Sequence, residues 1–117
     1  MSEVLTLQVP ERLLERLRPL SPWLPTVLEL SLAGFRTRAV QTASELIAFL
    51  SAGPTPEEVI DCTVSDEAQQ RLRRLLALNE AGLLSEEEQT ELDEIEQIEH
   101  IILMLKADTR KRLAGNA

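Results

Sequence analysis

The chain has 117 residues and a formal net charge of −8, because 20 acidic residues outnumber 12 basic ones. An apolar content of 44% allows a buried core and excludes a compositionally disordered chain. A single Cys excludes an internal disulfide, and a single His makes a zinc site of His and Cys ligands within one chain implausible. The negative net charge opposes non-specific binding to nucleic acid, which depends on Lys and Arg.

The sequence carries no signal for a membrane or for export. Its longest uninterrupted apolar runs, Leu46–Leu50 and Ile101–Leu105, are five residues each, which is too short for a transmembrane helix. Its first residues lack the basic and apolar stretches of a signal peptide. We therefore expect a cytoplasmic protein without membrane contact.

Charge is distributed unevenly along the chain. Residues 1–40 contain four acidic and five basic residues, a net charge of +1, whereas residues 41–117 contain 16 acidic and seven basic residues, a net charge of −9. Such an asymmetry indicates two functional parts. We expect a dimerisation unit over residues 1–52 and an acidic helical region over residues 53–117.

The first residues show the alternation of a β-strand. Leu5, Leu7 and Val9 would lie on one face of an extended segment, and Pro10 would end it. A single strand in an otherwise helical chain has no neighbour with which to pair. The pattern therefore predicts a homodimer in which this strand pairs with the same strand of a second copy.

The rest of the chain has the apolar spacing of helices. We expect helices over residues 11–20, 25–36 and 39–52, with the last two either separate or parts of one bent helix. Capping boxes that begin at Thr55 and Ser85 predict two further helix starts. The remaining helices are expected over residues 56–62, 66–82 and 86–113, and the last two form an αα-hairpin. The expected fold is mainly α with one short N-terminal strand.

The stretch from Val4 to Leu17, VLTLQVPERLLERL, resembles the start of ribbon-helix-helix proteins of the CopG/MetJ/Arc type. In that family, paired strands of a dimer lie in the major groove of DNA and their outward residues contact bases. The resemblance implies that Thr6 and Gln8 read operator DNA. Dimerisation through the same unit without DNA stays open as the alternative.

A second resemblance covers residues 66–113. The segments LLALNEAGLLSEEE and ELDE, followed by the Glu99-His100 pair and LKA, are similar to the C-terminal region of small bacterial proteins of a cyanobacterial type. Some of those proteins resemble antitoxins, which implies a protein partner. A basic partner such as a nuclease toxin would complement the acidic residues of this region. The residues expected to bind it are Glu86, Glu87, Glu88, Glu91, Asp93 and Glu94.

The sequence therefore predicts a non-enzymatic, antitoxin-like interaction protein without a metal or cofactor. The alternative is a structural subunit or adaptor of a larger bacterial complex that does not bind DNA. A weaker hypothesis is a metal site made by Glu96, Glu99 and His100 across a dimer, although a Glu-x-x-His motif is absent because Gln97 stands where its carboxylate would be. Cys62 has no nearby His to activate it, so it is expected to fill space as a half-buried apolar residue.

Overall fold

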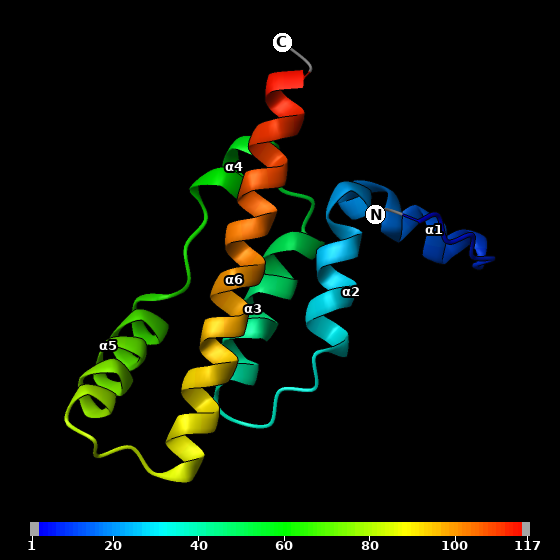
Figure 1. The fold of residues 1–117 in the computed structure, drawn as a ribbon. Coiled ribbons are helices and arrows are strands. Elements are labelled where there is room, and N and C mark those ends of the chain that lie inside the picture. Colours follow the sequence, from blue (N-terminus) through cyan, green and yellow to red (C-terminus); the bar gives the residue numbers. More distant parts are fainter. Residues whose placement is uncertain (1–2, 116–117) are drawn as a thin grey trace.

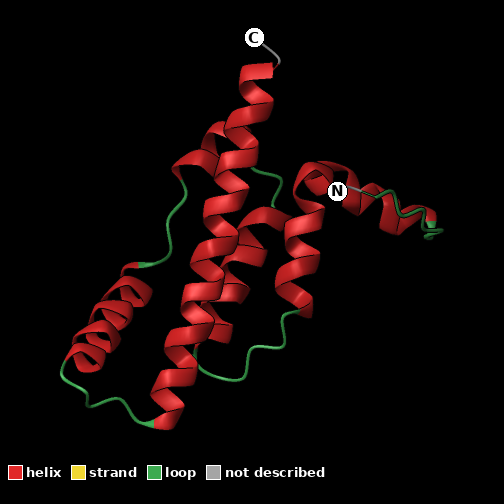
Figure 2. Ribbon diagram, viewed as in Figure 1, coloured by secondary structure: helices red, strands yellow, loops and turns green. Residues whose placement is uncertain are grey.

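The computed structural model describes residues 3–115, and this part of the chain consists of helices joined by loops (Figures 1 and 2). The 30-residue helix α6 is the longest element, and helices α2 to α5 all pack against it. In chain order the elements are α1 (Glu11–Leu17), the 3-10 helix η1 (Arg18–Trp23), α2 (Leu24–Leu32), α3 (Ala39–Ser51), α4 (Pro56–Asp61), α5 (Asp66–Glu80) and α6 (Glu86–Gly115).

The mainly α class is confirmed, but the predicted N-terminal strand is wrong. Residues 3–10 are irregular, and no strand occurs anywhere between residues 3 and 115. A strand is held by hydrogen bonds to a neighbouring strand. The alternating pattern of residues 4–9 specifies side-chain direction only, and residues 3–9 form no backbone hydrogen bond with another segment of the described chain.

The region from residue 24 to residue 51 forms two helices instead of one bent helix. Helix α2 ends at Leu32, and α3 begins only at Ala39. Gly34 in the connecting loop has φ = 70°, a left-handed conformation that suits glycine and interrupts a helix. The chain therefore reverses between α2 and α3, so that both helices lie alongside α6 (Figure 1).

One hydrophobic core joins all of these helices except α1. Its centre includes Leu50, Leu75 and Ile98, whose side chains are completely inaccessible to solvent. Trp23 of η1 belongs to this core, and its indole Nε1 donates a hydrogen bond of 3.0 Å to the carbonyl oxygen of Pro54. The core thus draws residues from both sides of the boundary expected near residue 52.

Local capping motifs define the helix ends that the sequence predicted. The hydroxyl of Ser85 accepts a hydrogen bond from the backbone N–H of Glu88, whose carboxylate accepts one from the backbone N–H of Ser85. Thr55 and Glu58 form the same capping box at the start of α4. At the end of α5 the N–H of Leu83 bonds to the carbonyl of Leu78, which completes a Schellman motif around the left-handed Gly82.

Gly53 offers a test of how closely η1 packs against the end of α3. Its φ is 73°, and a Cβ atom added there would lie 2.9 Å from the carbonyl oxygen of Pro19. We expect Gly53→Ala to lower the free energy of unfolding by about 2–3 kcal/mol, since left-handed strain costs about 1–2 kcal/mol and the contact adds to it. Urea denaturation measures this change.

The matched control is Gly82→Ala. Gly82 has nearly the same φ of 72°, but an added Cβ would meet nothing within 4 Å. This variant should lose only the strain of about 1–2 kcal/mol. Equal losses for the two variants would contradict the close contact at Gly53.

Candidate functional site

The N-terminal arm, defined here as residues 3–17, projects from the side of the helical body (Figure 1). None of its residues is buried. The exposed fractions of Val4, Leu5 and Leu7 are 96%, 82% and 72%, and Leu13 and Leu14 are also exposed. A run of large apolar side chains that the chain itself leaves in solvent is typical of a protein-binding segment.

Both predicted DNA-contacting residues lie on this arm. Thr6 and Gln8 are exposed and belong to the irregular segment before α1. The resemblance placed them on a paired ribbon, and residues 3–10 do not form one. Their role in DNA binding stays a prediction.

The six acidic residues expected to bind a partner all lie in the first three turns of α6 but differ in their surroundings. Glu86, Glu87 and Asp93 are exposed, and Asp93 accepts a hydrogen bond from Gln89 at 3.0 Å. The other three residues are buried or partly buried, and the carboxylate of each has a partner elsewhere in the chain. One of them, Glu88, forms the capping box with Ser85, and hydrogen bonds from Ser85 lower its pKa.

Glu91 is 3% exposed and forms an ion pair with Arg71 of α5. The pair is bidentate, since the Nε and Nη2 atoms of Arg71 donate to the two carboxylate oxygens at 2.7 Å and 2.8 Å. These hydrogen bonds raise the pKa of Arg71. Two parallel hydrogen bonds of this kind fix the relative orientation of the two side chains and add to the attraction between their charges. The pair therefore holds α5 against α6.

Glu94 holds the loop between α2 and α3. Its carboxylate accepts hydrogen bonds from the backbone N–H groups of Arg36 and Thr37 and from the Thr37 hydroxyl, at 2.6–3.2 Å. Partial burial by itself raises the pKa of Glu94, but these hydrogen bonds and the positive charge of Arg36 outweigh it and lower the pKa below its ordinary value. The charged form of Glu94 is thus the form that the fold favours.

This arrangement predicts a pH-dependent stability difference between the wild type and Glu94→Gln. A carboxyl group whose pKa is lowered by folding stabilises the native state above its unfolded pKa of about 4.3, and that contribution is lost as the pH falls through the folded pKa. We expect the wild type to be more stable by about 1–2 kcal/mol at pH 7, the order of a hydrogen bond to a charged group. The difference should shrink as the pH falls below about 4.

Urea titrations of both proteins between pH 3 and pH 7 measure this difference. The control is Glu87→Gln, since Glu87 is exposed and its carboxylate forms no hydrogen bond within residues 3–115. A gap between wild type and Glu94→Gln that does not change with pH would contradict the assigned role.

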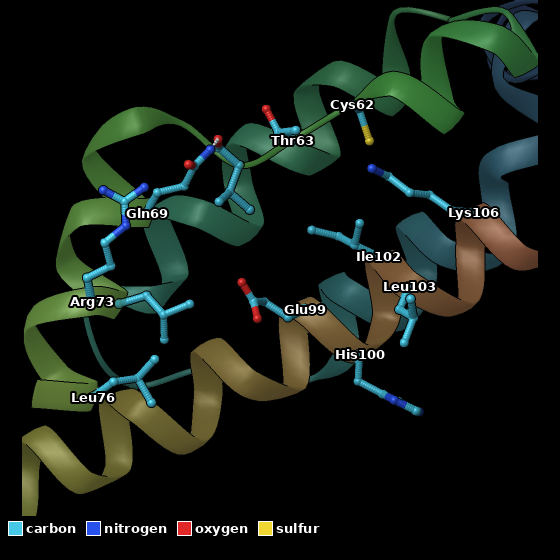
Figure 3. A pocket seen from close by; sticks show the side chains of 12 residues that line it. Cys62, Thr63, Gln69, Arg73, Leu76, Glu99, His100, Ile102, Leu103 and Lys106 are labelled. Atoms are coloured by element: carbon cyan, nitrogen blue, oxygen red, sulfur yellow. Dashed lines mark hydrogen bonds between the residues drawn. The ribbon is translucent and has the colours of Figure 1, made fainter. Parts of the chain in front are cut away.

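An open groove of about 730 Å³ lies between α5, α6 and the loop before α5 (Figure 3). Apolar side chains of both helices line it, among them Leu72, Leu76 and Ile102, together with the charged side chains of Glu99 and Lys106. Both Glu99 and His100 line the groove, and Figure 3 shows their side chains directed to different sides of α6, with Glu99 directed toward α5.

Cys62 lines the same groove and is partly buried. Burial raises the pKa of its thiol, and the positive charge of Lys106 counters this only in part. The thiolate is the nucleophilic form, so a raised pKa makes Cys62 less reactive than an exposed thiol. Within residues 3–115, no three His, Cys, Asp or Glu side chains come close enough together to hold a metal ion. The hypothesis of a metal site shared across a dimer is not tested by a single chain.

Comparison with known protein families, with curated proteins and with solved structures gave no match for this chain. The resemblances to ribbon-helix-helix proteins and to small bacterial proteins thus stay predictions. Among residues 3–115, no helix combines the length and the apolar character needed to cross a membrane.

Sequence reasoning did not find two exposed apolar residues on α6, Leu103 and Met104, whose exposed fractions are 62% and 48%. The signal was present, because both lie outside the helical stripe that includes Ile98, Ile102 and Leu105. Both remain largely exposed to solvent, although Leu103 also lines the groove between α5 and α6.

Proposed function

We propose that this chain is a non-enzymatic, antitoxin-like interaction protein that binds a basic protein partner, such as a nuclease, through its N-terminal arm. The observation that carries the proposal is the arm itself, which exposes Val4, Leu5, Leu7, Leu13 and Leu14 and buries no residue in its own chain. Fully burying one such leucine against a partner contributes about 1.5–3 kcal/mol. Only a few of these residues are needed to supply most of a binding free energy.

The charge of the chain supports a basic partner. The net charge is −8, and Glu86, Glu87 and Asp93 place exposed carboxylates at the start of α6. Complementary charge accelerates association and favours one partner over others. Glu88, Glu91 and Glu94 are less available, because each carboxylate is already hydrogen-bonded within the chain.

The experiment compares three full-length proteins as baits in cells that make the protein naturally. They are the wild type, the arm variant Leu5→Ser/Leu7→Ser and the control Leu32→Ser/Leu83→Ser. The control also removes two exposed leucines, with exposed fractions of 82% and 68%, but from outside the arm. Quantitative mass spectrometry identifies the captured proteins, and titration with the purified partner gives the affinity.

A basic nuclease that binds the wild type and the control, but binds the arm variant at least tenfold more weakly, supports the proposal. Affinity should also fall as salt rises, because salt screens charge complementarity. Equal capture by all three baits would overturn the role of the arm. Capture of a large assembly without a basic partner would favour the alternative of a structural subunit.

Binding of operator DNA is a separate prediction, and the proposed function does not depend on it. A gel-shift titration at low salt with DNA from upstream of the gene tests it. Loss of a wild-type shift in Thr6→Ala/Gln8→Ala would establish that these residues read DNA. The absence of any shift would remove DNA from the function.

A further inference from the structure

A continuous surface of α6 points away from the helical body. In the view of Figure 1, α6 passes in front of α3. Exposed residues recur along α6 at intervals of three and four. This spacing places them on one side of a helix. The α6 outer face, as we call it, consists of Asp93, Glu96, His100, Leu103, Met104, Ala107, Arg110 and Lys111, all of which are exposed.

The middle of the α6 outer face is apolar. Leu103 and Met104 expose 62% and 48% of their surface, and Ala107 is exposed beside them. None of these three belongs to the core cluster. Large apolar side chains in the centre of an otherwise polar face are the usual arrangement of a protein interface.

The two ends of the same face carry opposite charges. On this face Asp93 and Glu96 lie before the apolar centre, and Arg110 and Lys111 lie after it. The helix dipole accounts for charges in the first and last turns only. Asp93 and Glu96 lie beyond the first turn, so the dipole does not explain their place.

This distribution is symmetric about the apolar centre. Glu96 lies as many residues before the midpoint of Leu103 and Met104 as Lys111 lies after it. The rise of 1.5 Å per residue places each about 11 Å from that midpoint. When two such helices lie antiparallel, the acidic end of one meets the basic end of the other, and the apolar centres coincide.

We propose that the α6 outer face pairs antiparallel with the same face of a second copy of this chain, around a two-fold axis near Leu103 and Met104. The occupant is a second copy because the face is complementary to itself, as a two-fold interface requires. Parallel pairing would place acidic residues against acidic residues. Residues 93–111 span about 27 Å of helix. An interface of this size forms a weak dimer that depends on concentration.

This inference goes beyond the proposed function, because it concerns the α6 outer face and not the N-terminal arm, and the two arguments share only Asp93. The first test measures molar mass by sedimentation equilibrium over a wide range of concentration. We expect the wild type to rise from its monomer mass of 13.1 kDa toward twice that value. Met104→Glu should raise the dissociation constant at least tenfold.

The matched control is Leu32→Glu. It places the same charge on an exposed leucine of α2, so that both variants have the same net charge. The control should dimerise as the wild type does. Circular dichroism verifies that both variants remain folded. A wild type that stays monomeric at millimolar concentration would overturn the proposal, as would equal effects of the two substitutions.

The second test asks whether the charged ends of this face meet across the pair. In Asp93→Lys/Glu96→Lys both ends of the face are basic, and in Arg110→Glu/Lys111→Glu both ends are acidic. All four positions are exposed and form no ion pair within residues 3–115, so the variants should fold. Each variant alone should be monomeric, and an equimolar mixture of the two should form a heterodimer.

Heterodimer formation in the mixture should weaken as salt rises, because salt screens the attraction between the unlike ends. Dimers of either variant alone, or no heterodimer in the mixture, would show that the charged ends do not meet. Either result would overturn the antiparallel arrangement.

Discussion

Replacing Trp23 with alanine is expected to lower the free energy of unfolding by about 3–5 kcal/mol. Trp23 is 2% exposed, packs in the core and donates a hydrogen bond from Nε1 to the carbonyl oxygen of Pro54. The substitution leaves a cavity, and it also leaves that carbonyl without its donor. Since native domains are stable by only about 5–15 kcal/mol, a loss of this size would bring the protein close to unfolding.

Urea denaturation followed by far-UV circular dichroism measures this loss without relying on the fluorescence of the single tryptophan. Trp23→Phe retains an aromatic ring and loses the indole donor, so it should cost less than Trp23→Ala. Leu32→Ala, at a position 82% exposed, should change the stability by no more than about 0.5 kcal/mol. A loss below about 1 kcal/mol for Trp23→Ala would contradict the packing described for the core.

Replacing Glu91 with alanine is expected to cost about 2–3 kcal/mol. Removing one partner of a buried ion pair costs roughly 3–5 kcal/mol, because the other charge is left without compensation. The Arg71 side chain is 24% exposed, so water compensates part of its charge, and the expected loss is smaller. Glu91 should therefore affect the stability of the α5–α6 pair more than it affects partner binding.

A double-mutant cycle checks this expectation. Arg71→Ala/Glu91→Ala should cost at least 1 kcal/mol less than the sum of the two single changes, because the pair is lost only once. Glu87→Ala on the same helix is the control, and it should be nearly neutral since Glu87 is exposed. Additive losses would show that the two charges do not interact in solution.

The contrast between Glu87 and Glu91 shows which properties of the candidate site could be predicted from the sequence. Both were expected in the first turns of the last helix, and both lie there. Their surroundings depend on residues far away in the chain. Arg71 precedes Glu91 by 20 positions, and Thr37 precedes Glu94 by 57. No periodicity within α6 contains that information.

At the N-terminal segment a local pattern was present, but the strand that it predicted did not form. The alternation of Leu5, Leu7 and Val9 is a real local pattern, but a strand also needs a neighbour that supplies its backbone hydrogen bonds. Residues 3–10 have no such neighbour and are irregular. The apolar side chains whose alternation predicted a strand are exposed to solvent, and the proposed function is argued from that exposure.

The sequence by itself predicted which segments are helical and the helix ends that carry local capping motifs, whereas the α-helices expected over residues 11–20 and 25–36 end earlier, at Leu17 and Leu32. The capping boxes at Thr55 and Ser85 and the left-handed turn at Gly82 depend on residues a few positions apart, so local pattern is sufficient to predict them. Only the tertiary structure decided which side of each helix is buried, which carboxylates have partners and which apolar residues remain in solvent. Those properties depend on contacts between segments distant in sequence, and packing against α6 brings these segments together.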